Sequence, residues 1–193
     1  MNLQKQTLLF SLLKKFLIAL LCLSPGGLRA EEVQQRIFIG LAGDVLTPIG
    51  VSLNEFYNTG FGVSVTGQYE LTRHLVSTLT ASYVSFPANA PDGITVEDGS
   101  VIPVVAGLKF CLPTGNVRFF AALDAGVASL NRSVRSSPDG PTVSSSTTEF
   151  VWQPHLGFES KLGNNSSVEI SSRYVGIQGN ETIGIRIGIL FGI

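Results

Sequence analysis

The sequence has little charge and little cysteine, and beyond its N-terminal segment it has no long apolar run. Charged residues make up 14% of the 193 residues, whereas hydrophobic residues make up 44%. No stretch of 18 or more apolar residues follows the first 30 residues, which excludes a transmembrane helix there. Such a chain places its apolar side chains either in a soluble β core or on the outside of a barrel that contacts lipid. Its length allows one domain.

The N-terminus has the order of features that is typical of a secretory signal peptide. Lysines precede an apolar run over residues 16–23, and a Pro-Gly-Gly sequence ends that run before the small residue Ala30. The run is too short to cross a bilayer, so we expect it to be removed. We place the cleavage after Ala30, with a cut after Gly26 as the alternative. The predicted domains are a signal peptide over 1–30 and one folded domain over 31–193.

Removal of residues 1–30 changes the charge and the cysteine content. It leaves nine basic and 14 acidic residues, a formal net charge of −5. No basic patch with interleaved aromatics remains to neutralise phosphates, which argues against a nucleic-acid partner. Cys111 becomes the only cysteine, so neither an intramolecular disulfide nor a cysteine metal site is available. Cys22 could suggest a lipid-modified cysteine, but Leu21 stands where lipoprotein signals resemble one another in having a small residue.

Alternation of apolar and polar residues is the main signal after residue 36, and it recurs in about eight segments of the length of an outer-membrane strand. The last segment, residues 182–193, shows it best because isoleucines alternate with glycines and Arg186. A strand places such isoleucines on one face, and we expect that face to contact lipid. The first segment is less regular because Phe38 shares a face with Asp44. The isoleucines predicted to point outward are Ile185, Ile187 and Ile189.

The connections between the segments alternate in length, as they do in an outer-membrane barrel with short periplasmic turns and longer outer loops. The connection over 131–147 is rich in Ser, Thr, Pro and Gly, and we expect it to be a mobile loop. Pro103 is predicted to mark a strand start and Pro154 to sit at a bulge. The long connections are expected near 47–59, 87–100 and 131–147, and the short ones near 71–73, 113–116 and 163–165. The final outer loop, near 176–181, is also short, which weakens the alternation there.

Two stretches resemble known outer-membrane proteins. The C-terminal residues 186–193 are similar to the assembly signal of outer-membrane barrels, with Arg186, Gly188, Phe191 and Ile193 at its defining positions. The stretch from Trp152 to Glu159, followed by Tyr174, resembles the penultimate hairpin of opacity-type and OmpA-like barrels. The resemblance implies an all-β fold, an eight-stranded antiparallel up-and-down transmembrane β-barrel in the outer membrane of a Gram-negative bacterium. The partners it implies are outer-membrane lipid and the barrel-insertion machinery.

Charged residues on the polar face of the strands are predicted to fill the barrel. Eight strands enclose a lumen just wide enough for side chains, so we expect a packed polar core and not an open pore. Buried charges are tolerated when they are paired and hydrogen-bonded, and the equal numbers of each sign suggest a structural salt-bridge network. The predicted members are Glu70, Asp124, Glu159 and Glu169 with Lys109, Arg118, Arg173 and Arg186.

The sequence offers little for catalysis. His155 and Glu159 point the same way on one strand, which permits a base and its orienting carboxylate, but no nucleophile stands beside them. The two histidines lack clustered carboxylates, so we predict no metal site, no cofactor and no catalytic residue. We expect a non-enzymatic barrel that supports envelope integrity or surface interaction through its loops, whose ligand stays unknown. The alternatives are an outer-membrane lipid-modifying enzyme and a secreted lipocalin-like binder of a small apolar ligand.

Overall fold

The computed structural model describes residues 36–49, 57–89, 95–96, 98–135, 142–163, 165–178 and 180–193. The predicted signal peptide and its cleavage site lie outside the described residues, so both stay predictions. Within these ranges, no helix combines the length and the apolar character needed to cross a membrane. The described residues form the strands β1 (Ile37–Pro48), β2 (Gly60–Thr72), β3 (Leu75–Phe86), β4 (Thr95–Val96), β5 (Gly99–Thr114), β6 (Val117–Arg135), β7 (Thr142–Lys161), β8 (Ser166–Ile177) and β9 (Asn180–Gly192).

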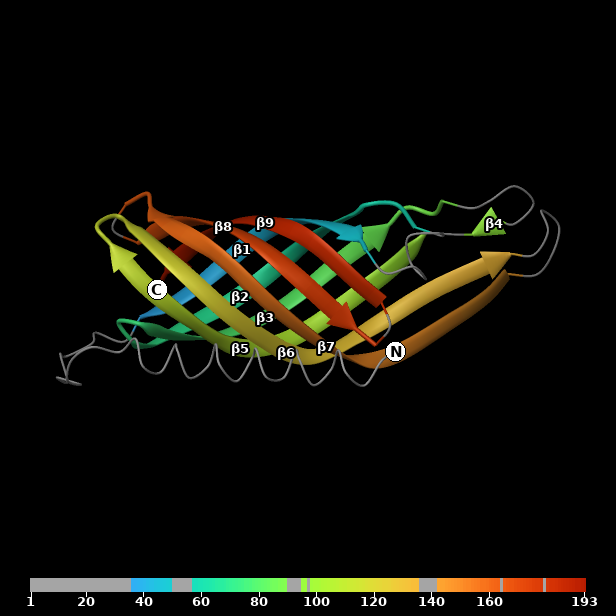
Figure 1. The fold of residues 1–193 in the computed structure, drawn as a ribbon, viewed down its shortest axis with the longest axis horizontal. Coiled ribbons are helices and arrows are strands. Elements are labelled where there is room, and N and C mark those ends of the chain that lie inside the picture. The colour runs from blue at the N-terminus through green and yellow to red at the C-terminus, as the bar shows by residue number, and fades with distance from the viewer. Residues whose placement is uncertain are drawn as a thin grey trace, which may run out of the picture. The chain divides into compact units, whose positions relative to one another are not determined.

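Eight of these strands form one closed antiparallel barrel (Figure 1). Each barrel strand pairs with the barrel strands before and after it, and β1 pairs with β9 over eleven residue pairs to close the cylinder. Closure gives every barrel strand a partner strand on both sides, which a strand surrounded by lipid requires. The remaining strand, β4, is two residues long and pairs with the far end of β6. The predicted eight-stranded antiparallel up-and-down barrel is confirmed.

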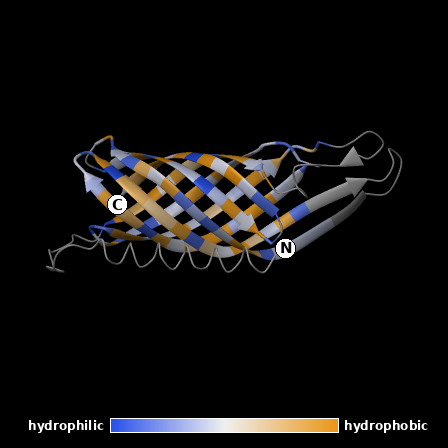
Figure 2. Cartoon of the chain, in the orientation of Figure 1, coloured by the Kyte–Doolittle hydropathy of each residue, from blue (hydrophilic) through white to orange (hydrophobic). Residues whose placement is uncertain are grey.

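Side chains alternate between the outside and the inside of the barrel along each strand, and Figure 2 shows the resulting pattern of apolar and polar residues. On β9, Ile185 and Ile187 are 53% and 56% exposed, whereas Arg186 between them is 4% exposed. The prediction that the isoleucines point outward is therefore confirmed. The outer face is apolar on the other strands too, as lipid contact requires. Its exposed side chains include Leu41, Phe61, Val63, Val65, Leu79, Leu108, Phe119, Val127, Leu156 and Ile189.

The two ends of the barrel differ in their connections. At one end, here called the turn end, two-residue turns follow β2 and β5, and residues 162–165 join β7 to β8. Gly115 in the turn after β5 has φ 62°, a left-handed conformation that glycine adopts without steric cost. At the other end, here called the loop end, residues 49–59 separate β1 from β2 and residues 87–98, which include β4, separate β3 from β5, whereas only residues 178–179 separate β8 from β9. Ile193 bonds to the Ile37 carbonyl at the turn end, so the described chain starts and finishes there.

The connection expected to be a mobile loop over 131–147 is mostly strand, and that prediction was wrong. β6 continues to Arg135, β7 begins at Thr142, and the two pair up to these residues. In Figure 1 they project beyond the other barrel strands at the loop end. Serine and threonine dominate this part of β7, and a partner strand that satisfies its backbone holds it extended. Composition alone does not reveal that partner.

Pro103 and Pro154 lie inside strands, so the predicted strand start and bulge were both wrong. Each proline is paired with β6 on one side, where the ladder is continuous. On its other side the ladder skips two residue pairs and then resumes in the same register. A residue in an antiparallel strand directs its N–H to only one neighbour, so the missing donor interrupts only one ladder. The pairs on either side of the gap at Pro103 are Ala81–Val104 and Val84–Val101. Those on either side of the gap at Pro154 are Trp152–Gly176 and His155–Arg173.

Candidate functional site

The barrel interior holds buried charges from the described strands, and Lys109 of β5 lies at their centre in the turn-end half. Its Nζ lies 2.7 Å from Oε1 of Glu159 and 2.6 Å from Oε2 of Glu169. Arg118 of β6 pairs with Glu159 as well and also with Glu70 of β2. Lys109 is 1% exposed and Glu159 3%, so neither charge could be held there without its partners. Five strands therefore contribute to one ion-pair network across the lumen.

A second ion-pair cluster lies closer to the loop end and is centred on Asp44 of β1. Oδ1 of Asp44 lies 2.8 Å from Nη2 of Arg173 and 3.0 Å from Nε of Arg186. All three residues are less than 5% exposed. Nε and Nη1 of Arg173 have no hydrogen-bond partner among the described residues. One carboxylate thus serves two guanidinium groups, and Arg173 keeps donors that are not used.

Asp124 of β6 connects His155 to Thr78 inside the barrel. Its Oδ2 lies 3.1 Å from Nε2 of His155, and its Oδ1 accepts the hydroxyl of Thr78 at 2.8 Å. The carboxylate next to His155 is therefore Asp124 and not Glu159. A histidine that activates a nucleophile bonds to the hydroxyl itself, whereas here both bonds end on the carboxylate. This arrangement holds side chains in place and does not prepare the Thr78 hydroxyl for attack.

The structure places all eight predicted interior charges inside the barrel and brings seven of them into ion pairs with charged side chains other than histidine. Asp124 instead pairs with His155. The sequence did not predict Asp44 as a member of the network, because this residue shares a face with the apolar Phe38. The weak alternation near Phe38 obscured that signal. Gln68 is a further unpredicted member, and its Nε2 donates to Glu169 at 3.2 Å.

The four residues of the predicted assembly signal lie on both faces of β9 and at its end. Arg186 and Gly188 are buried, whereas Phe191 is 51% exposed and Ile193 80% exposed. Their role in insertion stays a prediction. Among the residues that the structure describes, no group of three or more His, Cys, Asp or Glu side chains is placed to hold a metal ion.

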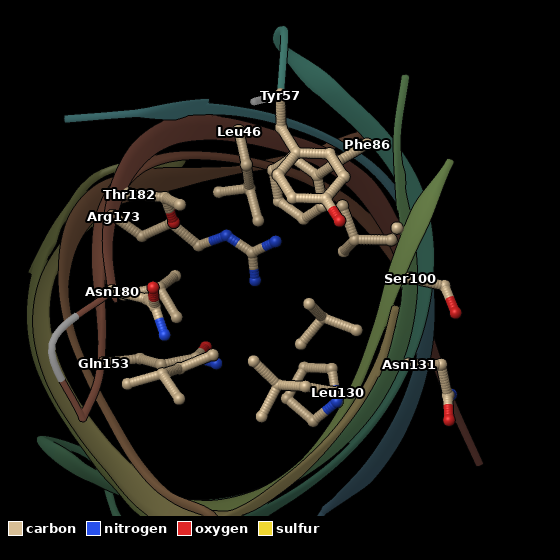
Figure 3. Close-up of a pocket in the computed structure, with 16 residues that line it drawn as sticks. Leu46, Tyr57, Phe86, Ser100, Leu130, Asn131, Gln153, Arg173, Asn180 and Thr182 are labelled. Atoms are coloured by element: carbon tan, nitrogen blue, oxygen red, sulfur yellow. The ribbon is translucent and has the colours of Figure 1, made fainter. Parts of the chain in front are cut away.

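A small cavity of about 40 Å³, partly open to solvent, occupies the loop-end part of the interior (Figure 3). Its wall is mostly apolar, and the Arg173 guanidinium reaches into it among these side chains. In Figure 3 the side chains of Ser100 and Asn131 point away from the cavity. The buried apolar residues that line it are Leu46, Tyr57, Val84, Phe86, Leu130, Val175 and Ile177.

No protein-family profile matches the chain, and no curated protein matches its sequence. Solved structures match its fold. Neisserial surface protein A aligns with a TM-score of 0.58 at 12% identity, over 80% of this chain and 96% of that one. Ail, the attachment invasion locus protein of Yersinia pestis, aligns with a TM-score of 0.55 at 17% identity, over 82% and 97%. OprG of Pseudomonas aeruginosa aligns with a TM-score of 0.52 at 14% identity, over 82% and 95%.

At these identities the likeness concerns the fold and not the activity. The fold agrees with the apolar outer face and with the ion pairs that fill the lumen. The chain is an eight-stranded antiparallel β-barrel of the small kind found in the Gram-negative outer membrane.

Proposed function

We propose that the protein is a non-enzymatic integral barrel of the outer membrane that supports envelope integrity or surface interaction through the parts exposed at its loop end. One observation carries the proposal: the barrel is apolar outside and closed inside by ion pairs, while β6 and β7 project beyond it. A lumen crossed by such pairs favours a structural core over a wide channel. Outer-membrane lipid and the insertion machinery are the partners that this placement requires.

The projecting ends of β6 and β7, here called the hairpin and defined as residues 131–135 and 142–146, offer the surface for recognition. Ser145, Ser146, Thr147 and Thr148 next to or within it are exposed. A paired hairpin presents such hydroxyl groups in a fixed arrangement, which favours binding over a purely shielding loop. One solved structure of Ail contains the heparin analogue sucrose octasulfate. Sulfated polysaccharide is therefore the first ligand class to test for this chain.

The rival hypotheses have less support. A lipid-modifying enzyme needs a nucleophile next to a base at the membrane surface, whereas His155 is 6% exposed and bonds to Asp124. A soluble lipocalin-like binder needs a polar exterior, whereas Phe61, Val63 and Leu156 are each more than 60% exposed. Lipid analysis of cells that lack the gene tests the enzyme hypothesis. A changed lipid A or phospholipid profile that returns with the gene would contradict our proposal.

A variant with a shortened hairpin tests the role in surface interaction separately from the role in envelope support. In the variant, a two-residue Asn-Gly turn replaces residues 132–145, so that Asn131 and Ser146 remain paired as they are now. We expect cells that carry it to lose adhesion to heparin-coated surfaces but to keep wild-type resistance to detergent with a chelator. A matched control shortens residues 49–59 at the same end. Equal adhesion of both variants and the wild type would exclude the hairpin as the binding surface, and wild-type behaviour of the gene deletion in both assays would reject the proposal.

A further inference from the structure

One edge of β7 has no partner strand where β7 projects beyond the barrel. Residues 142–150 pair with β6 on one side, whereas the ladder to β8 begins only at Val151–Ile177. β8 ends there, so among the described residues no strand continues along the other side of β7. Figure 1 shows this part of β7 beyond the ends of β8 and β9. Residues 142–148 of β7 are called the free edge below.

The backbone groups that point out of the free edge belong to the even-numbered residues. Successive residues of an antiparallel strand direct their N–H and C=O groups to opposite sides. At the turn end of β7, the Lys161 amide donates to Asn116 on the side of β6, and the Leu162 amide donates to Ser166 on the side of β8. The register with β6 is continuous from there to residue 142, so even-numbered residues face the open side. They are Thr142, Ser144, Ser146 and Thr148.

The free edge lacks the sequence devices that keep exposed strand edges apart. Natural sheets protect such edges with lysine, proline, inward-pointing charge or a bulge. Residues 142–148 read Thr-Val-Ser-Ser-Ser-Thr-Thr, with neither a charge nor a proline, and their continuous register with β6 contains no bulge. Residues 145–148 are exposed. The open side of β7 can therefore accept another strand along this whole segment.

The sequence of the free edge is complementary to itself in the antiparallel direction. A two-fold axis at Ser145 places Thr142 opposite Thr148 of a second copy and pairs the serines on either side of the axis with each other. All four outward-facing residues of each copy then both donate and accept a backbone hydrogen bond. Threonine and serine are favourable neighbours across antiparallel strands, whereas like charges are not. The nearest charge, on Glu149, lies beyond the paired residues at opposite ends, so the two carboxylates stay apart.

We propose that the free edge binds the free edge of a second copy of this chain as an antiparallel pair of strands, and that the two copies lie in membranes that face each other. Copies in one membrane all direct their loop ends outward, so their free edges run in the same direction. Facing membranes bring the edges together in opposite directions. This contact rests on the surface interaction of the proposed function but needs no polysaccharide. Many weak pairs between two surfaces add up to firm attachment.

Vesicles shed from the outer membrane test the contact, because they carry the full protein with its loop end outward. Vesicles with and without the protein, from a Gram-negative host that lacks O-antigen, are labelled in two colours. Without heparin, we expect vesicles that carry the protein to cluster with each other and not with vesicles that lack it. No clustering, or equal entry of both kinds into the clusters, would overturn the proposal. Vesicles that fail to cluster but adhere to heparin would overturn this contact alone and leave the proposed function standing.

Two substitutions at Ser146 distinguish backbone pairing from recognition of the hydroxyl group. Ser146→Pro removes an amide on the open side and leaves the ladder to β6 intact, so it should lower clustering by about tenfold or more. Ser146→Ala keeps both backbone groups, so clustering should stay at the wild-type level. Heat-modifiable gel mobility checks that both variants are folded. Wild-type clustering of Ser146→Pro, or loss of clustering in Ser146→Ala, would overturn the proposal.

A cysteine at position 145 tests the register of the two strands. The axis brings the two copies of Ser145 together as a non-hydrogen-bonded pair, with Cα atoms about 4.5 Å apart, which a disulfide can span. Differently tagged Ser145→Cys proteins on separate vesicles should therefore form a disulfide-linked dimer with both tags when diamide oxidises them. Cys111 is buried and does not compete. Thr147→Cys is the matched control, because position 147 faces position 143 of the second copy. Equal cross-linking of the two variants, or none with Ser145→Cys, would overturn the proposal.

Discussion

Asp44 on β1 faces Arg186 on β9 where the first and last strands of the barrel meet, and its Oδ1 accepts the Nε–H of Arg186 at 3.0 Å. The two residues are 142 positions apart in the sequence. Their ion pair joins the strands whose pairing closes the cylinder. Asp44 holds Arg173 of β8 at the same time, so one carboxylate links three consecutive strands around the barrel.

Replacing Asp44 with asparagine should destabilise the barrel strongly. Two buried guanidinium groups would lose the carboxylate that they bond to, and the removal of one partner from a buried ion pair costs about 3–5 kcal/mol. The free energy of unfolding in urea, measured on the protein in phospholipid vesicles, gives the effect. Asp98→Asn is the control, because Asp98 is exposed and its bond to the Ala88 amide needs only an acceptor oxygen. The same unfolding free energy for Asp44→Asn and the wild type would contradict the assigned role.

Gly107 should not tolerate alanine. A Cβ there would lie 2.0 Å from Oδ1 of Asp124 and 2.3 Å from the backbone oxygen of Leu123. Overpacking of this kind costs about 1–3 kcal/mol and would also displace Asp124 from His155. Gly43→Ala is the matched control, since no atom outside residues 42–44 lies within 4 Å of a Cβ at that position. The measurement is the temperature at which each heated variant converts to the gel mobility of the unfolded protein. A lower conversion temperature for Gly43→Ala but not for Gly107→Ala would show that the close approach at Gly107 has no effect.

An arginine on the outer face should cost most near the middle of a strand. Ile187 is 56% exposed and lies near the centre of β9, where lipid surrounds it. Ile187→Arg should lower the free energy of unfolding by about 2–4 kcal/mol in vesicles, and Leu162→Arg by about 0–1 kcal/mol. Leu162 is just as exposed but lies in the connection at the turn end. Equal losses for the two variants would argue against a membrane around β9.

Phe191 is expected to serve the insertion machinery. If the C-terminal residues are the assembly signal, Phe191→Ala should slow the appearance of folded, heat-modifiable protein in the outer membrane of growing cells. Phe119→Ala is the control, because Phe119 is exposed to a similar degree on β6, outside the signal. Ile193→Phe should hasten assembly, since most such signals end in an aromatic residue. Identical assembly rates for the four proteins would exclude this role.

The face that each side chain occupies could be predicted from the sequence because a strand has a period of two. Arg186 and its flanking isoleucines show this directly, and the interior position of Lys109 follows from the same rule. The rule does not predict which side chains from strands that are not adjacent lie next to each other in the interior. The Nζ of Lys109 bonds to Glu169, 60 residues away on a strand that does not pair with β5. Only the narrow width of the closed lumen brings these two atoms together.

The other differences between expectation and structure have the same origin. The Ser- and Thr-rich part of β7 is a strand because β6 satisfies its backbone, and Pro154 needs no bulge because its missing donor falls on the side of β8. The cavity at Arg173 also depends on how eight strands arrange their inward side chains. The order of residues along the chain thus decided the barrel class and the two faces of each strand, since these follow from local periodicity. The ion-pair partners, the hairpin and the cavity were decided by closure of the cylinder, which alone sets distances between strands far apart in the sequence.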